Sequence, residues 1–400
     1  MEIAGTIFWR HMQTLTIEQT KELRGLCHAG RLYDIEKMLA QYGTITAHPD
    51  VKRAPIDIAM KLGFHSLVEL LIRKTDDIKV KNHALRAAVR NRRFDMVEML
   101  VGYGADPLSA PFEDVLCSYD AEMGRYFMSK GADLVTGNPF AIAFQECTRP
   151  ALGVYLDAYK AYPHLKDALQ RQLDMALSYH CKDGSIKWVS LLMWAHADPL
   201  ARVPGLDDPE EDLDDPALGC TGARYAAMEG HLEVIKRICV NHTKPGWQDA
   251  LRSACSFGHT SIVEFLLDKG VKPNDKPNGG ASGLDSALNA IGRGARFSKN
   301  SPYPYPCTAS PSIEVIRLLV EHGALWVPDD NSAINGARRS LYEVEKRYTL
   351  DVIKLFATYG ACDKNLLWKF VSSSTMVGRL ALDDLEKLID KQWLKGRRLP

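Results

Sequence analysis

The side chains best suited to recognise a ligand are a group of arginines between residues 53 and 93. Arg86 and Arg90 are four residues apart, so they lie on one face of a helix if this segment is helical. Arg93 follows in the next turn, and Arg53 is near in sequence. Guanidinium groups bind carboxylates and phosphates through paired hydrogen bonds. The strip is either a binding surface or a solvated face balanced by the neighbouring aspartates, which are Asp76, Asp77 and Asp95.

An acidic stretch, residues 204–216, carries seven carboxylates and three prolines in thirteen residues. Such a composition has too few apolar side chains to form a packed structure by itself. Three interpretations stay open: a solvated loop, a contact for a basic partner, and a calcium site. Asp207, Asp212 and Asp214 would supply the hard oxygen ligands that calcium prefers, although their spacing is not that of an EF-hand.

A second irregular stretch, residues 292–306, combines cations with aromatic rings. Arg293, Arg296 and Lys299 could neutralise a nucleic-acid strand while Phe297 and the tyrosines stack on its bases. The alternation of tyrosine and proline at Tyr303 and Tyr305 also suits a protein contact, because exposed tyrosine is a common interface anchor. A tolerated loop is the third interpretation.

Catalytic and metal-binding patterns are absent from the sequence. His180 and Cys181 are adjacent, and adjacent residues on a helix do not face each other. The nine cysteines contain no Cys-x-x-Cys pair, and Cys117, Cys239 and Cys255 fall on apolar helical positions. We therefore expect small buried thiols in a reducing compartment, no catalytic residues, no metal and no cofactor.

The helix that positions these residues is clearest at residues 260–270. Ser261 can act as its N-cap, with Glu264 completing a capping box three residues later. Apolar residues leave no wide polar stripe, so the helix packs against neighbours on more than one side. Gly270 ends the helix, and Gly258 ends another apolar helix just upstream. The unit is helix, tight turn, helix, loop.

Copies of this unit recur along the chain, with helix ends mostly about 27–37 residues apart. Gly104-Ala105-Asp106-Pro107, Gly131-Ala132-Asp133 and Gly323-Ala324 repeat the same ending. Ala54-Pro55-Ile56-Asp57-Ile58-Ala59 resembles the Thr-Pro-Leu-His-x-Ala signature of ankyrin repeats, and Gly230-His231-Leu232-Glu233-Val234 resembles the turn that opens their second helix. The resemblance covers roughly residues 18–395. It implies protein recognition on a concave surface formed by first helices and the loops before them.

We therefore predict an all-α fold, an ankyrin-type helical repeat solenoid with about 10–11 repeats and two inserted loops. The predicted segments are an N-terminal cap (1–17), divergent ankyrin repeats 1 to 6 (18–200), an acidic proline-rich insertion (201–218), regular ankyrin repeats (219–273), a repeat with a Pro/Tyr-rich insertion (274–311), C-terminal repeats with a capping repeat (312–395) and a basic tail (396–400).

The function that these features favour is a non-enzymatic scaffold or adaptor with a protein partner. That partner is expected to be acidic, and the chain an immunity protein, an effector or a subunit of a larger complex. The partner-binding residues expected are Arg53, Arg86, Arg90, Arg93, Tyr303 and Tyr305. The alternative is a nucleic-acid or phosphate contact through the arginine strip and the 293–305 loop. The net charge is zero, so no global field favours nucleic acid or membrane.

The sequence also predicts an intracellular, cytoplasmic protein. Residues 1–10 have neither a basic start nor a long apolar core, so we expect no signal peptide. No apolar run approaches the roughly 18 residues that a transmembrane helix needs. Membrane contact and a small-molecule substrate are not expected.

Overall fold

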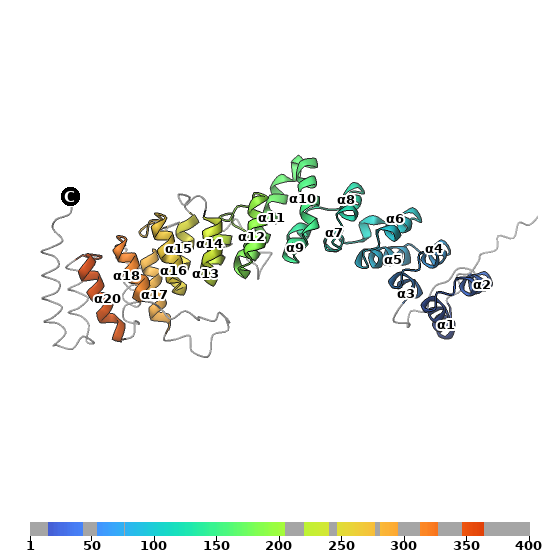
Figure 1. Cartoon of the computed structure of the whole chain (residues 1–400), viewed down its shortest axis with the longest axis horizontal. Helices are drawn as coiled ribbons and strands as arrows, with labels where there is room; N and C mark the ends of the chain where they lie inside the picture. Colours follow the sequence, from blue (N-terminus) through green and yellow to red (C-terminus); the bar gives the residue numbers. More distant parts are fainter. Residues whose placement is uncertain are drawn as a thin grey trace, which may run out of the picture. The chain divides into compact units, whose positions relative to one another are not determined.

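The computed structural model describes residues 15–42, 54–75, 77–204, 220–239, 246–276, 281–294, 313–326 and 346–363. Across these residues the chain is built of α-helices joined by short turns (Figure 1). The described part has no strand, only an isolated antiparallel bridge between Val203 and Cys220. The predicted all-α repeat fold is confirmed.

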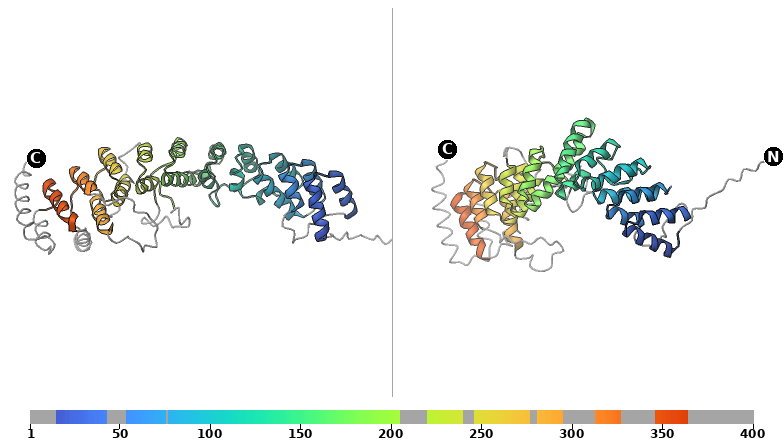
Figure 2. Two further views of the ribbon diagram at one scale, coloured as in Figure 1. Left: turned by 60° about the horizontal axis from the view of Figure 1, so that its bottom comes forward. Right: turned by 45° about the vertical axis from the view of Figure 1, so that its right-hand side comes forward.

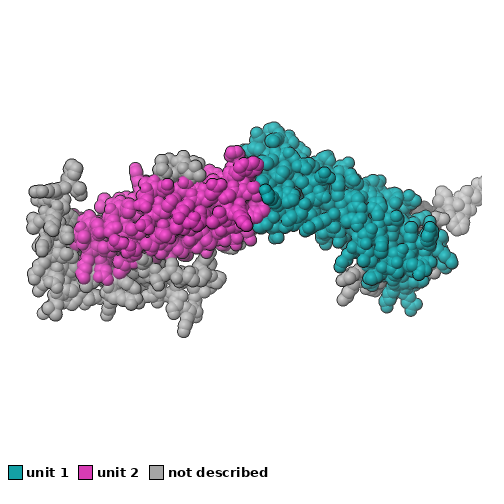
Figure 3. All heavy atoms as spheres, in the orientation of Figure 1, with its two compact units in different colours: residues 1–172 teal, residues 173–400 magenta. Residues whose placement is uncertain are grey.

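The chain divides into two compact units, residues 1–172 and 173–400 (Figure 3). In the described part of unit 1, five first helices alternate with five second helices. The first helices are α1 (Ile17–His28), α3 (Pro55–Lys61), α5 (Ile78–Arg90), α7 (Phe112–Leu116) and α9 (Pro139–Gln145). The second helices are α2 (Leu32–Tyr42), α4 (His65–Arg73), α6 (Phe94–Gly102), α8 (Ala121–Ser129) and α10 (Pro150–Ala161).

The unit boundary falls within α11 (Lys166–Asp183), which pairs with α12 (Ile186–Trp194). Unit 2 continues with the pairs α13 (Gly222–Glu229) and α14 (Leu232–Ile238), α15 (Gly246–Phe257) and α16 (Thr260–Asp268), and α17 (Gly283–Gly294) and α18 (Ile313–Glu321). Helix α20 (Lys346–Tyr359) follows, and the residues before it lie outside the described part.

Within each unit, first helices contact first helices and second helices contact second helices of the neighbouring pair (Figure 2). In unit 1, α3 lies between α1 and α5, and α4 lies between α2 and α6. In unit 2, α15 lies between α13 and α17, and α16 lies between α14 and α18. Each pair therefore buries its apolar side chains against its neighbours in sequence, as repeat proteins do.

A residue with a left-handed backbone marks each turn between a first and a second helix that the structure describes. Glycine takes this role at Gly30, Gly63, Gly184, Gly230 and Gly258, with φ between 67° and 81°. In three consecutive pairs the residue is instead Arg92, Tyr119 or Cys147, with φ of 58°, 63° and 58°. Because side chains disfavour this conformation, these turns carry a backbone cost that the glycine turns avoid.

The residue that follows this turn covers the turn of the preceding pair. The rings of Phe64 and His259 lie over Gly30 and Gly230. His259 also donates from Nε2 to the Met228 carbonyl oxygen at 2.8 Å, and His231 donates to the Lys182 oxygen at 3.0 Å. Adjacent repeats are therefore joined at their turns by packing and by hydrogen bonds.

This arrangement corrects the predicted start of α16. The helix begins at Thr260, and His259 is its N-cap, without a capping bond from its side chain. Ser261 therefore lies inside the first turn, and the predicted Ser261–Glu264 capping box is wrong. The imidazole occupies the cap position because it contacts the preceding repeat, a requirement that a local capping pattern does not contain.

Aromatic side chains fill the core where the repeats are most divergent. Phe112, Phe140, Phe144 and Tyr155 come from α7, α9 and α10, and all are buried. Phe140 contacts Phe112 and Tyr155 edge to face, with ring centroids 5.8 and 5.5 Å apart. Large rings thus maintain the packing between pairs that lack the regular repeat signature.

Candidate protein-binding face

Arg86 and Arg90 lie on the side of α5 that faces away from its core residues. Ala84, Leu85 and Val89 are buried against the neighbouring helices. Arg90 is exposed. Arg86 is only half-buried rather than exposed, and its Nε is shielded from solvent without a hydrogen-bond partner in the described part of the chain.

Arg93 is in the turn after α5, where it is the N-cap residue of α6. Its guanidinium donates to both carboxylate oxygens of Asp95, at 3.0 and 2.8 Å. The hydrogen bond from Arg93 is the main reason why the pKa of Asp95 lies below its usual value. Arg93 is therefore already paired and would have to exchange this carboxylate for one from a partner, whereas Arg86 and Arg90 form no ion pair with a described residue.

Several predicted binding residues lie outside the described part of the chain: Arg53, Tyr303 and Tyr305, together with most of the acidic insertion at 201–218 and of the 274–311 insertion. At the edges of the acidic insertion, the Val203 and Cys220 backbones exchange hydrogen bonds of 3.1 and 3.0 Å. This bridge holds the two ends of residues 204–219 together.

The first helices of unit 1 present charged side chains at a fixed register. Counting back six residues from the left-handed turn residue gives a half-buried row of Arg24, Asp57, Arg86 and Glu113 on α1, α3, α5 and α7. Counting back two gives His28, Lys61 and Arg90, all exposed. Sequence reasoning found Arg86 and Arg90 and missed the others. The other residues could have been found by counting back from the turn after each first helix. Glycine marks that turn after α1 and α3, but Arg92 takes its place after α5.

Asp57 bonds to the next first helix rather than to either neighbouring arginine. Its Oδ2 lies 3.1 Å from Nε2 of His83 on α5. Its Oδ1 is shielded from solvent and has no hydrogen-bond partner among the described residues. The contact ties α3 to α5 across the face and leaves one carboxylate oxygen without a bond.

The buried thiols are not nucleophiles at neutral pH. Burial raises the pKa of Cys181 and of Cys27 from 9.0 to about 12, and it also raises the pKa of Cys255. Each of these side chains is therefore a protonated thiol. His180, next to Cys181, stacks on Trp188 at 5.3 Å between ring centroids. Both residues of this pair are part of the core.

The expected burial of cysteines holds for Cys255 but only in part for two others. Cys117 and Cys239 are half-buried, and Cys147, at one of the left-handed turns, is exposed. None of the eight cysteines in the described segments is part of a disulfide bond.

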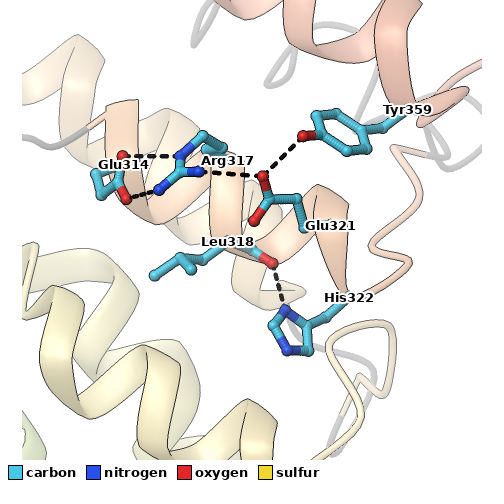
Figure 4. Close-up of polar contacts among 6 residues, drawn as sticks. All are labelled: Glu314, Arg317, Leu318, Glu321, His322 and Tyr359. Atoms are coloured by element: carbon cyan, nitrogen blue, oxygen red, sulfur yellow. Dashed lines mark hydrogen bonds and ion pairs between the residues drawn. The ribbon is translucent and has the colours of Figure 1, made fainter.

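A polar network between α18 and α20 shows how charged residues serve structure in this chain (Figure 4). Arg317 pairs with Glu314 and, at 3.2 Å, with Glu321. The Tyr359 hydroxyl donates to the same Glu321 oxygen at 2.7 Å. Arg317 is thus compensated within the protein, whereas Arg24 and Arg86 form no ion pair with a described residue.

The described segments contain neither a metal-binding group of side chains nor a membrane-spanning helix. No group of three or more histidine, cysteine, aspartate or glutamate side chains is arranged to hold a metal ion there. No helix in those segments is both long enough and apolar enough to cross a membrane.

Comparison with known proteins supports the repeat architecture. A family model described as ankyrin repeats (3 copies) matches residues 177–277. Human 26S proteasome non-ATPase regulatory subunit 10 is 44% identical over 62 residues, which is 14% of this chain and 27% of that protein. The chain thus matches about a quarter of the length of this curated relative. Together with the stacked helix pairs, these matches support an ankyrin repeat protein.

Proposed function

We propose that this chain is a non-enzymatic scaffold or adaptor that binds an acidic protein partner on the first-helix face of unit 1. Ankyrin repeats generally mediate protein–protein interaction. The observation that carries the proposal is the pair Arg86 and Arg90: both project from one helix, and neither makes an ion pair among the described residues. Arginine binds carboxylates with two parallel hydrogen bonds, so an acidic protein surface is the best complement.

The variation of this face from repeat to repeat also favours selective recognition. The backbone register is constant, whereas the residue two before the turn changes from histidine to lysine to arginine. Different side chains on a constant framework provide a surface that fits one partner. The relative named as a proteasome regulatory subunit makes a role as a subunit of a larger complex reasonable. An immunity protein or a host-directed effector would use the same face.

The absence of disulfide bonds among the eight described cysteines is consistent with a cytoplasmic protein, because disulfides are rare in the reducing cytosol. Fractionation of native cells, with the chain detected by an antibody, tests this placement.

Replacing Arg86 and Arg90 with glutamate tests the proposed binding face. The partner is first isolated from the native host with the tagged chain and identified by mass spectrometry. Arg86→Glu/Arg90→Glu should then weaken its binding by at least about tenfold, or about 1.4 kcal/mol, because like charges would face each other. The effect should shrink at high salt.

Lys160→Glu/Lys187→Glu is the matched control. These lysines are exposed on the second helices α10 and α12, and the net charge changes equally. Binding is measured at low and at high salt. Equal affinity of the wild type and the arginine variant at both concentrations would reject this face. Recovery of nuclease-sensitive strands instead of a stoichiometric protein would favour the alternative, a nucleic-acid or phosphate contact through the Arg53–Arg93 strip and the 293–305 loop.

A further inference from the structure

Three charged side chains occupy the same place in three successive first helices of unit 1. Arg24, Asp57 and Arg86 are each six residues before the left-handed turn residue of their repeat. Their helices are neighbours, since α3 contacts both α1 and α5. The result is a row with the charges plus, minus, plus, which we call the charge row.

Each member of the charge row has an unsatisfied polar atom. Nε of Arg24, Oδ1 of Asp57 and Nε of Arg86 are all shielded from solvent and lack a hydrogen-bond partner in the described segments. Native proteins rarely leave such atoms without partners, because the lost hydration is not recovered. A ligand cannot reach these shielded atoms, but the three residues are only half-buried, so other atoms of the same side chains stay accessible to it.

The charges of the row do not neutralise one another. No ion pair joins Asp57 to Arg24 or Arg86 within the described residues; the carboxylate contacts His83 instead. The corresponding arginine of α15 behaves differently: Arg252 pairs with Asp249 of its own helix at 2.7 Å. At the same register of α13, Arg224 also has a shielded Nε without a hydrogen-bond partner among the described residues. What distinguishes the charge row is therefore its acidic member, Asp57, between two arginines.

The spacing of the row restricts the conformation of what can bind along it. Packed helices lie about 8–10 Å apart, so successive members of the row are separated by about that distance. Seven residues of an α-helix span about 10.5 Å and return to the same face. A β-strand cannot match this period, because residues three apart, about 10 Å, point to opposite faces.

We propose that the charge row binds a helical segment of a partner protein that presents an acidic, a basic and an acidic side chain seven residues apart. This inference rests on the proposed function and adds to it the charge order and the conformation of the partner. The outer carboxylates bond to Arg24 and Arg86, and the central cation bonds to Asp57. Asp57 repels a continuous run of carboxylates or phosphates, so it selects against uniform polyanions.

Two stapled helical peptides of about 20 residues test the charge order. One carries Glu, Lys and Glu at seven-residue spacing, and the other carries Glu at all three positions. Each has a fluorine label, and its binding to the full chain is followed by line broadening in fluorine nuclear magnetic resonance. The wild-type chain should bind the Glu-Lys-Glu peptide at least about fivefold more tightly, a typical coupling for a close charge pair.

Reversal of the central charge should reverse the preference. The Asp57→Lys chain should favour the all-glutamate peptide, and Arg24→Glu/Arg86→Glu should lose both. Lys160→Glu/Lys187→Glu should retain the wild-type preference. Circular dichroism verifies that each variant keeps its helix content, and Asp57→Asn, which should only abolish the preference, replaces Asp57→Lys if the latter unfolds.

Equal binding of the two peptides by the wild-type chain, or no broadening with either at millimolar concentration, overturns the charge order. If the native partner still depends on Arg86 and Arg90 in that case, the proposed function stands and only this inference fails. If no protein partner is recovered from the host, the proposed function fails first.

Discussion

At the scale of single residues, the left-handed turns have two different physical requirements. Gly230 has φ 81°, and a Cβ added there would lie 2.6 Å from the His259 ring. Gly270 has φ 85°, but nothing lies within 4 Å of an added Cβ. The two glycines therefore separate the cost of the backbone conformation from the cost of the close contact.

Alanine at these two positions should destabilise the chain to different extents. Gly270→Ala should lower the free energy of unfolding by about 1–2 kcal/mol through left-handed strain alone. Gly230→Ala should cost about 1–3 kcal/mol more, because the histidine must shift and its hydrogen bond to Met228 is disturbed. Urea unfolding followed by circular dichroism measures both, and equal losses would mean that the ring over Gly230 yields freely.

At the scale of elements, one buried amide joins α11 to the loop before α9. Gln172 Nε2 donates to the Leu134 carbonyl oxygen at 2.8 Å, and the Phe140 N–H donates to Gln172 Oε1 at 2.9 Å. All of these contacts are within unit 1. The Gln172 side-chain amide thus satisfies one backbone donor and one backbone acceptor that have no helical partner here.

Removal of this amide should destabilise unit 1. Gln172→Ala would leave two buried backbone groups unpaired, at about 1–3 kcal/mol each. The neighbouring Arg171→Ala, at an exposed position, should change stability by less than about 0.5 kcal/mol. Hydrogen exchange at the Phe140 amide gives a direct local measurement. Unchanged protection there in Gln172→Ala would contradict the assigned role.

The sequence allowed the helices to be predicted better than the contacts between them. Gly104, Gly131 and Gly270 end second helices visibly, because a left-handed cap demands glycine or a tolerant residue. Arg92 and Cys147 take the same backbone without that signal, so the repeat register in the divergent region was not readable. Likewise, the N-cap position of His259 depends on its contact with the preceding repeat, and the place of Asp57 between two arginines depends on how α3 packs against α1 and α5. Neither can be derived from the local sequence.

At the scale of the whole molecule, stability is distributed over contacts between neighbouring pairs. Leu100 on α6 and Leu266 on α16 occupy corresponding positions of their second helices, and both are fully buried. One belongs to unit 1 and the other to unit 2. Burial of Leu266 agrees with the predicted packing of the helix at residues 260–270 against neighbours on more than one side.

Truncation of either leucine should loosen its own surroundings. Leu266→Ala should cost about 2–5 kcal/mol from lost burial and the cavity left behind, and Leu100→Ala a similar amount. In a repeat array the loss spreads first to the nearest pairs. Hydrogen exchange should therefore rise in α14 and α18 for Leu266→Ala, and in α4 and α5 for Leu100→Ala, because these helices contact the altered ones.

A loss of unfolding free energy below about 0.5 kcal/mol would place Leu266 outside the packed interface. A uniform rise along the chain would show instead that the repeats unfold as one cooperative body, because nearest-neighbour coupling predicts a gradient away from the altered helix.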